Sequence, residues 1–109
     1  MNKKEKVKDK RLYKTYGIKL KDFKAKQKEQ HGVCWICQQL PRTHLCVDHR
    51  HVPKYKKMQP EEKKKEVRAL LCFSCNKLLI GRLERFKNLR TLLPRVIEYF
   101  EVYKMRWDE

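Results

Sequence analysis

The chain has 109 residues, 39% of them charged, with 29 lysines and arginines against 13 acidic residues. A chain of this length makes one domain at most and buries only a thin hydrophobic core, so it needs additional stabilisation. The formal net charge of +16 indicates a polyanionic partner, and nucleic acid is the first candidate. No stretch approaches the roughly 20 apolar residues of a membrane span, so we expect a soluble protein without a membrane partner.

Basic residues dominate the N-terminal segment, where twelve of the first 28 residues are lysine or arginine and three are acidic. Residues 1–15 lack hydrophobic periodicity, so we expect a flexible basic arm there, ahead of a single domain over residues 16–109. A short helix is predicted from about Leu20 to Gln30. Leu20 and Phe23 share one face of it, and Gly32 provides the C-terminal stop.

Two Cys-x-x-Cys pairs, Cys34 with Cys37 and Cys72 with Cys75, are separated by 34 residues. Four thiolates arranged in this way suit the tetrahedral shell of a structural zinc ion, whose binding contributes roughly 10 to 16 kcal/mol to folding. The alternative is a disulfide framework in a secreted mini-protein. The odd number of cysteines, five, and the sequence MNKKEKVKDKR, which has no apolar signal core, favour zinc and a reducing cytoplasm.

Residues 44–50 and 67–71 mix aliphatic, β-branched and polar residues, and we expect two short strands that pair. The segment between them, VPKYKKMQPEEKKKE, predicts an exposed loop with a helical turn starting at Pro60. Tyr55 in this loop is a candidate to stack on bases. The basic residues here are expected to bind DNA phosphates without reading sequence; they are Lys54, Lys56, Lys57, Lys63, Lys64, Lys65 and Arg68.

The C-terminal third is expected to be helical. Apolar residues recur at helical spacing from Leu79 to Leu89. A final helix is predicted to start near Thr91 as N-cap, with Pro94 in its first turn. Its apolar residues either pack on the core or form a dimer interface, and core packing is the first expectation because so small a domain needs every apolar face. They are Val96, Ile97, Phe100 and Tyr103.

Asp48, His49 and His51 lie between the cysteine pairs, and Asn76 follows Cys75 directly. The four sulfurs already fill a zinc shell, so these side chains are available for other chemistry. Neighbours in a strand point to opposite sides, and Asp48 and His49 therefore take different roles. Other interpretations remain: an Asp-His pair is often only structural, and an Asn at a helix start is often only a polar end residue.

Four blocks, YGIKLKDF at 16–23, HGVCWIC at 31–37, VDHRH at 47–51 and VRALLCFSCNKLLIG at 67–81, resemble the recombination endonuclease VII group of HNH nucleases. The resemblance implies a small α+β fold with a ββα-metal (His-Me finger) core, stapled by a four-cysteine zinc site and flanked by helices. The chain departs from the family in three places. Fifteen residues separate His51 from Val67, Ala69 stands where Gly is common, and Leu79 stands where some members carry an acid.

The resemblance implies a metal-dependent DNA endonuclease, encoded by a phage or prophage, that acts in the host cytoplasm as a monomer or homodimer. Asp48 and Asn76 would hold a catalytic magnesium or manganese ion, His49 would act as general base, and His51 would support it. The substrate would be duplex DNA that is nicked or branched DNA that is cleaved. The competing hypothesis is a non-catalytic zinc module that binds nucleic acid.

Overall fold

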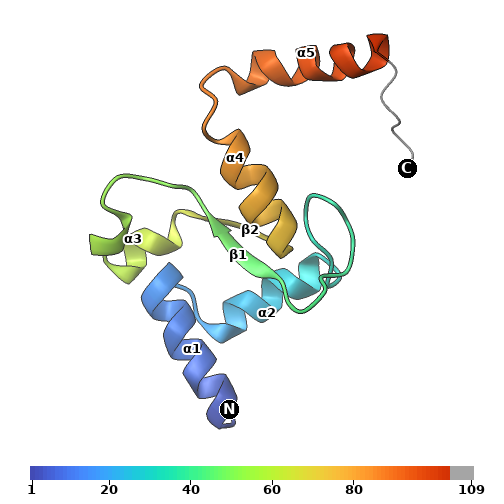
Figure 1. Cartoon of the computed structure of the whole chain (residues 1–109). Helices are drawn as coiled ribbons and strands as arrows, with labels where there is room; N and C mark the ends of the chain where they lie inside the picture. The colour runs from blue at the N-terminus through green and yellow to red at the C-terminus, as the bar shows by residue number, and fades with distance from the viewer. Residues whose placement is uncertain (104–109) are drawn as a thin grey trace.

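A computed structural model describes residues 1–103, so residues 104–109 of the expected domain lie outside the described residues. The chain forms a small α+β structure in which several of the helices lie around a two-stranded sheet and the last one extends away from it (Figure 1). In chain order the elements are α1 (Lys3–Tyr16), α2 (Leu20–Glu29), β1 (Cys46–His49), η1 (Tyr55–Lys57), α3 (Pro60–Lys64), β2 (Val67–Leu71), η2 (Ser74–Ile80), α4 (Gly81–Leu83) and α5 (Leu89–Val102).

The two predicted strands are confirmed and pair antiparallel. Cys46 lies opposite Leu71, Val47 opposite Leu70 and His49 opposite Val67, so one residue of β1 faces two residues of β2. The additional residue makes a bulge, which increases the local twist and redirects side chains. The bulge is formed by Arg68 and Ala69 of β2, and it lies opposite Asp48, the residue for which the sequence predicted a functional role.

The hydrophobic core is thin and lies between the sheet and the helices α1 and α2. Its members come from six parts of the chain that are far apart in sequence: Leu12, Ile18, Leu20, Phe23, Cys34, Leu45, Val47, Leu70, Leu71 and Cys75. Two of the predicted metal ligands, Cys34 and Cys75, are thus part of the core. The cysteine cluster and the hydrophobic core therefore occupy the same region.

The flexible arm predicted over residues 1–15 is corrected by the structure, because residues 3–16 form the helix α1. Asn2 caps it: its side-chain oxygen accepts a hydrogen bond from the Glu5 N–H at 2.8 Å, and Glu5 accepts one from the Asn2 N–H at 3.3 Å. Leu12 packs into the core. A single buried leucine among charged residues leaves no periodic pattern, which is why the sequence did not indicate this helix.

Gly17 ends α1 in the left-handed conformation, with φ of 74°, and allows α3 to approach closely. A Cβ atom at this position would lie 2.0 Å from the Pro60 carbonyl oxygen, which is far inside van der Waals contact. The helical turn predicted from Pro60 is confirmed as α3. The C-terminal end of α1 and the helix α3 thus pack against each other.

Helical structure after Cys75 is confirmed, but its packing differs from the expectation. The segment begins as a π-helix, η2, in which the Gly81 N–H donates to the carbonyl of Asn76. The helix α5 starts at Leu89, after Asn88, and Pro94 lies in its interior and not in its first turn.

The prediction that α5 packs on the core is wrong. None of its residues is buried, and Figure 1 shows the helix extending away from the sheet and from α1 and α2. Val96 and Ile97 keep 46% and 54% of their surface exposed. No helix within residues 1–103 is long and apolar enough to cross a membrane.

Candidate metal centre and candidate active site

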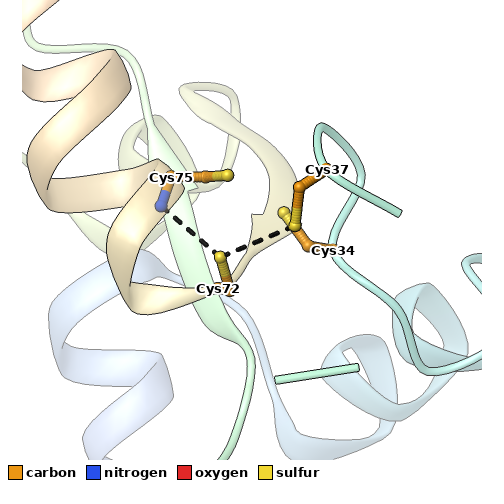
Figure 2. A group of neighbouring side chains, drawn as sticks. All are labelled: Cys34, Cys37, Cys72 and Cys75. Carbon is orange, nitrogen blue, oxygen red and sulfur yellow. Dashed lines mark hydrogen bonds between the residues drawn. The ribbon is translucent and has the colours of Figure 1, made fainter. Parts of the chain in front are cut away.

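Cys34, Cys37, Cys72 and Cys75 converge, with all four sulfur atoms within 4.8 Å of one another (Figure 2). The Cys37 and Cys72 sulfurs are 3.9 Å apart. Sulfur–metal bonds of about 2.3 Å in a tetrahedral shell place sulfurs roughly 3.8 Å apart, whereas a disulfide requires about 2.05 Å. All five cysteines lie in the described part of the chain, and each is free. The four are therefore positioned to bind a metal, and the fifth, Cys46, is outside the group.

Gln30 at the end of α2 joins the two cysteine pairs. Its amide nitrogen donates to the carbonyls of Val33 and Leu70, each at 2.9 Å, and its amide oxygen accepts from the Leu70 N–H at 2.9 Å. The Trp35 N–H also donates to the Leu70 carbonyl, at 3.1 Å. The first pair is thereby fixed to β2, which leads into the second pair. The sequence analysis missed Gln30, since a polar residue at a helix end gives no signal of a distant partner.

The cysteines of the cluster differ in their pKa values. Burial raises the pKa of Cys34, but N–H groups of Cys72, Cys37 and Ile36 outweigh it and lower that pKa to about 6. Burial and the neighbouring sulfurs raise the pKa of Cys75 to about 12. Four thiolates this close together repel one another, and a bound cation is what allows all of them to ionise.

The predicted catalytic residues lie together in a second place. A cavity of about 590 Å³ is lined by Asp48, His49, His51 and Asn76, which come from β1, the loop after it and η2. The same cavity is lined by three cations from the helical segment after the second cysteine pair: Lys77, Arg82 and Arg85. The sequence analysis did not include these three, although a cation on the helix that follows Asn76 is a signal that it could have used.

His49 is held in a defined orientation. Its Nδ1 atom is 3.1 Å from the Arg50 carbonyl oxygen. Its ring stacks on Tyr55 with 4.1 Å between centroids and 11° between planes, and His51 lies edge-on at 5.0 Å. Tyr55 was expected to stack on bases; the structure instead places it against His49, with its hydroxyl donating to the Thr15 carbonyl at 2.7 Å.

Asp48 is 7% exposed and is paired with Arg68. The guanidinium Nε atom is 2.6 Å from Oδ2 of Asp48, and Nη2 is 3.0 Å from Oδ1. Nη2 also donates to the His49 carbonyl at 3.2 Å and to Glu84 at 2.8 Å, while Glu84 lies 3.8 Å from His51. The bond to Asp48 raises the pKa of Arg68. The predicted role of Arg68 in binding phosphates therefore does not fit, because its donors serve two carboxylates.

Lys63 is a second correction among the predicted DNA-binding residues. It is 9% exposed, its Nζ atom donates to the Lys14 carbonyl at 2.9 Å, and it lies 5.4 Å from the centre of the Tyr55 ring. The residue follows Pro60 by one turn of α3, which turns it toward α1. The other five lysines of the segment are exposed, as predicted: Lys54, Lys56, Lys57, Lys64 and Lys65.

The fold and the two sites define a small α+β domain with four cysteines positioned to hold a metal and a basic cavity that contains acid–base groups. The family model described as recombination endonuclease VII matches residues 9–102, and the chain belongs to that family. It is 35% identical over 91 residues to the Gene 59 protein of Mycobacterium phage D29, a match that covers 82% of this chain and 47% of that protein. The chain thus spans about half the length of this curated relative. No solved structure matches the chain.

Proposed function

We propose that the chain is a divalent-metal-dependent DNA endonuclease of the HNH type, stapled by zinc. The observation that carries the proposal is the convergence of Asp48, His49, His51 and Asn76 in one basic cavity of a recombination endonuclease VII family member. The order β1, β2, η2 supports a ββα-metal core. Four cysteine sulfurs within 4.8 Å of one another support zinc at the cysteine centre, since zinc takes four such ligands in a tetrahedral shell. By its likeness to the phage protein, the nuclease would be phage encoded and act in the cytoplasm of a bacterial host.

His49 is the proposed general base. A carbonyl oxygen only accepts hydrogen bonds, so the contact with Arg50 places the ring proton on Nδ1 and leaves the Nε2 lone pair to take a proton from water. Stacking on Tyr55 holds the ring plane, and His51 lies at the ring edge. His51 would orient the water or contact the scissile phosphate.

Asp48 and Asn76 are the proposed holders of magnesium or manganese. The carboxylate and amide oxygens are the hard donors that these ions prefer, and both residues line the cavity. Arg68 binds both oxygens of Asp48, and each oxygen has a second lone pair with which it could coordinate the ion, while Glu84 also binds the guanidinium. A bound ion would neutralise charge on the scissile phosphate and stabilise the departing oxygen. Lys77, Arg82 and Arg85 would bind flanking phosphates.

The substrate proposed is branched DNA, with nicking of duplex DNA as the simpler activity of one site. Resolution of a branch requires cuts in two opposed strands, and therefore two active sites in a homodimer. A monomer would nick one strand. The competing candidate, a non-catalytic zinc module, has no need of a histidine with a fixed tautomer next to a buried carboxylate.

The test uses supercoiled plasmid and a four-way junction, each with and without magnesium or manganese. We expect wild-type cleavage with either ion, and a loss of roughly 100-fold or more for His49→Ala with DNA affinity retained. His44→Ala is the matched control, since His44 is exposed and does not line the cavity. Asp48→Ala is expected to regain part of its activity at high manganese concentration. If the wild-type protein cuts neither DNA with either ion, the non-catalytic module becomes the better explanation.

A further inference from the structure

The helix α1 separates its charges onto two sides. Seven of its fourteen residues are lysine or arginine, and all of these except Lys8 are exposed. Lys3, Lys10 and Lys14 are seven and four residues apart, which places them in one row along the helix. Lys4 and Arg11, also seven apart, make a second row beside it.

The two acids of α1 are both used in contacts that hold the helix in place. Glu5 caps Asn2 and pairs with Lys24 of α2 at 2.8 Å. Asp9 accepts a hydrogen bond from the Leu20 N–H, the first residue of α2, at 2.7 Å. The two rows of cations therefore have no acid of their own helix among them. An ordinary solvated face would mix both signs.

The helix is fixed to the rest of the domain and leads to the candidate active site. The Thr15 and Lys14 carbonyls accept hydrogen bonds from Tyr55 and Lys63 at 2.7 and 2.9 Å. The last residue of α1, Tyr16, lines the catalytic cavity, and its ring centroid is 5.8 Å from that of His49. Figure 1 shows the N-terminal end of α1 pointing away from the domain. Fourteen residues span about 21 Å, which is roughly six base pairs of duplex DNA.

We propose that α1 is a rigid DNA-binding arm, which contacts the backbone phosphates of the duplex that flanks the cleavage site. The proposal rests on the proposed function only in taking DNA as the substrate. The rows of cations suit a polyanion with regularly spaced charges, and they would bind any sequence alike. An anionic membrane fits less well. A membrane-bound helix needs an exposed apolar face, whereas Leu12 is buried and Val7 is the one large aliphatic residue of α1 that is exposed.

The experiment measures duplex affinity as a function of salt for the full-length, zinc-loaded protein without added magnesium or manganese. The probe is a fluorescent 30-base-pair duplex, and the variant combines Lys3→Gln, Lys10→Gln and Lys14→Gln. Glutamine keeps a similar helix propensity. The control combines Lys21→Gln, Lys28→Gln and Lys87→Gln, which remove the same charge from exposed positions outside α1 and the cavity. Circular dichroism establishes that both variants fold.

Each lost phosphate contact reduces the steepness of log K against log salt by about 0.9, so the α1 variant should be less steep by about 2 to 3. The control should change by less than about 1. Equal slopes for the α1 variant and wild type, or equal changes in both variants, would overturn the proposal. It would also be overturned if the α1 substitutions weakened binding to phosphatidylserine vesicles but left DNA binding unchanged. Cleavage separates the two hypotheses. A protein that binds through α1 but cuts nothing contradicts only the proposed activity, and one that cuts with an unchanged slope contradicts only the arm.

Discussion

Arg68 is the residue on which the buried charge of Asp48 depends. The carboxylate is almost fully removed from water, and its two oxygens are bonded to one guanidinium. Removing one partner of a buried pair costs about 3 to 5 kcal/mol, and the 37% exposure of the Arg68 side chain reduces that value.

We therefore expect Arg68→Gln to lower the free energy of unfolding by about 2 to 3 kcal/mol, measured by urea denaturation of the zinc-loaded protein. Arg50→Gln is the matched control. Arg50 also pairs with a carboxylate, that of Glu66 at 3.2 Å, but its side chain is 66% exposed, so its loss should cost less than about 1 kcal/mol. Equal costs for the two variants would contradict this account of Asp48.

Tyr55 stacks on His49, the proposed general base, and its hydroxyl donates to the Thr15 carbonyl of α1, so we expect it to position the histidine ring. Tyr55→Ala should lower the cleavage rate by about 10- to 100-fold through misplacement of the base, with DNA affinity little changed. Tyr55→Phe retains the stack and should cleave within a few-fold of wild type, losing about 1 kcal/mol of stability. A purely structural role would be indicated if Phe and Ala reduced the rate equally.

At the scale of elements, the lysines of α3 and of the segments beside it differ in exposure: Lys63 is buried against α1, and the others are exposed to solvent. Lys63→Ala removes the contact with the Lys14 carbonyl and the packing of the lysine stem, so it should lower stability by about 1 to 2 kcal/mol and leave the salt dependence of DNA binding unchanged. Lys65→Ala should do the reverse, reducing the slope by about 0.9 with stability within about 0.5 kcal/mol. The opposite pattern would mean that Lys63 leaves its partner to reach DNA.

At the scale of the whole molecule, we expect the fold to depend on the cysteine centre, because Cys34 and Cys75 also belong to the core. Cys72→Ser should release zinc and unfold the chain, and Cys46→Ser, outside the cluster, should do neither. Circular dichroism with metal analysis distinguishes these outcomes. A folded protein without zinc would contradict a structural role for the metal.

Zinc affinity should also fall steeply as pH falls, since protons compete for the sulfurs. At pH 7 the Cys34 thiol, with its pKa of about 6, is already largely ionised, whereas Cys75, with its pKa of about 12, is not. The pKa of Cys37 is also raised: the Gln39 N–H lowers it, but burial and hydrogen bonds with Cys34 and Cys72 outweigh that effect. Binding should then release about two protons or more, and log K should rise by about 2 per pH unit near neutrality. A competing chelator measures this slope, and a value below 1 would contradict it.

The helix α5 suggests how two copies of the chain would associate. None of its residues is buried, and Val96, Ile97 and Val102 keep 46%, 54% and 62% of their surface exposed. We expect a homodimer at twice 13.4 kDa in light scattering, with Val96→Glu and Ile97→Glu each giving a monomer that keeps its fold. Thr91→Glu, an exposed position of the helix at least 120° around its axis from both residues, is the control. A monomeric wild-type protein at every concentration tested would exclude this pairing.

The sequence by itself determined the features that depend on local chemistry. The four-cysteine cluster follows from two Cys-x-x-Cys pairs, and the strands and α3 follow from β-branched residues and from Pro60. The order of the four blocks determined the family, which the match over residues 9–102 confirmed. Each of these signals lies within a few residues of the chain, where spacing alone restricts the geometry.

Only the tertiary structure decided which charged side chains are available. Arg68 and Lys63 are residue types that often bind DNA phosphates. In the structure, however, Arg68 is bound to Asp48 and Glu84, and Lys63 is bound to a carbonyl of α1. The helix α1 required Leu12 to find a core built by distant segments, and α5 was left exposed although its apolar pattern resembles that of a packed helix. The reason is common to all four. Burial and pairing depend on partners that are remote in sequence, and periodicity reports only that a face is apolar or charged, not what covers it.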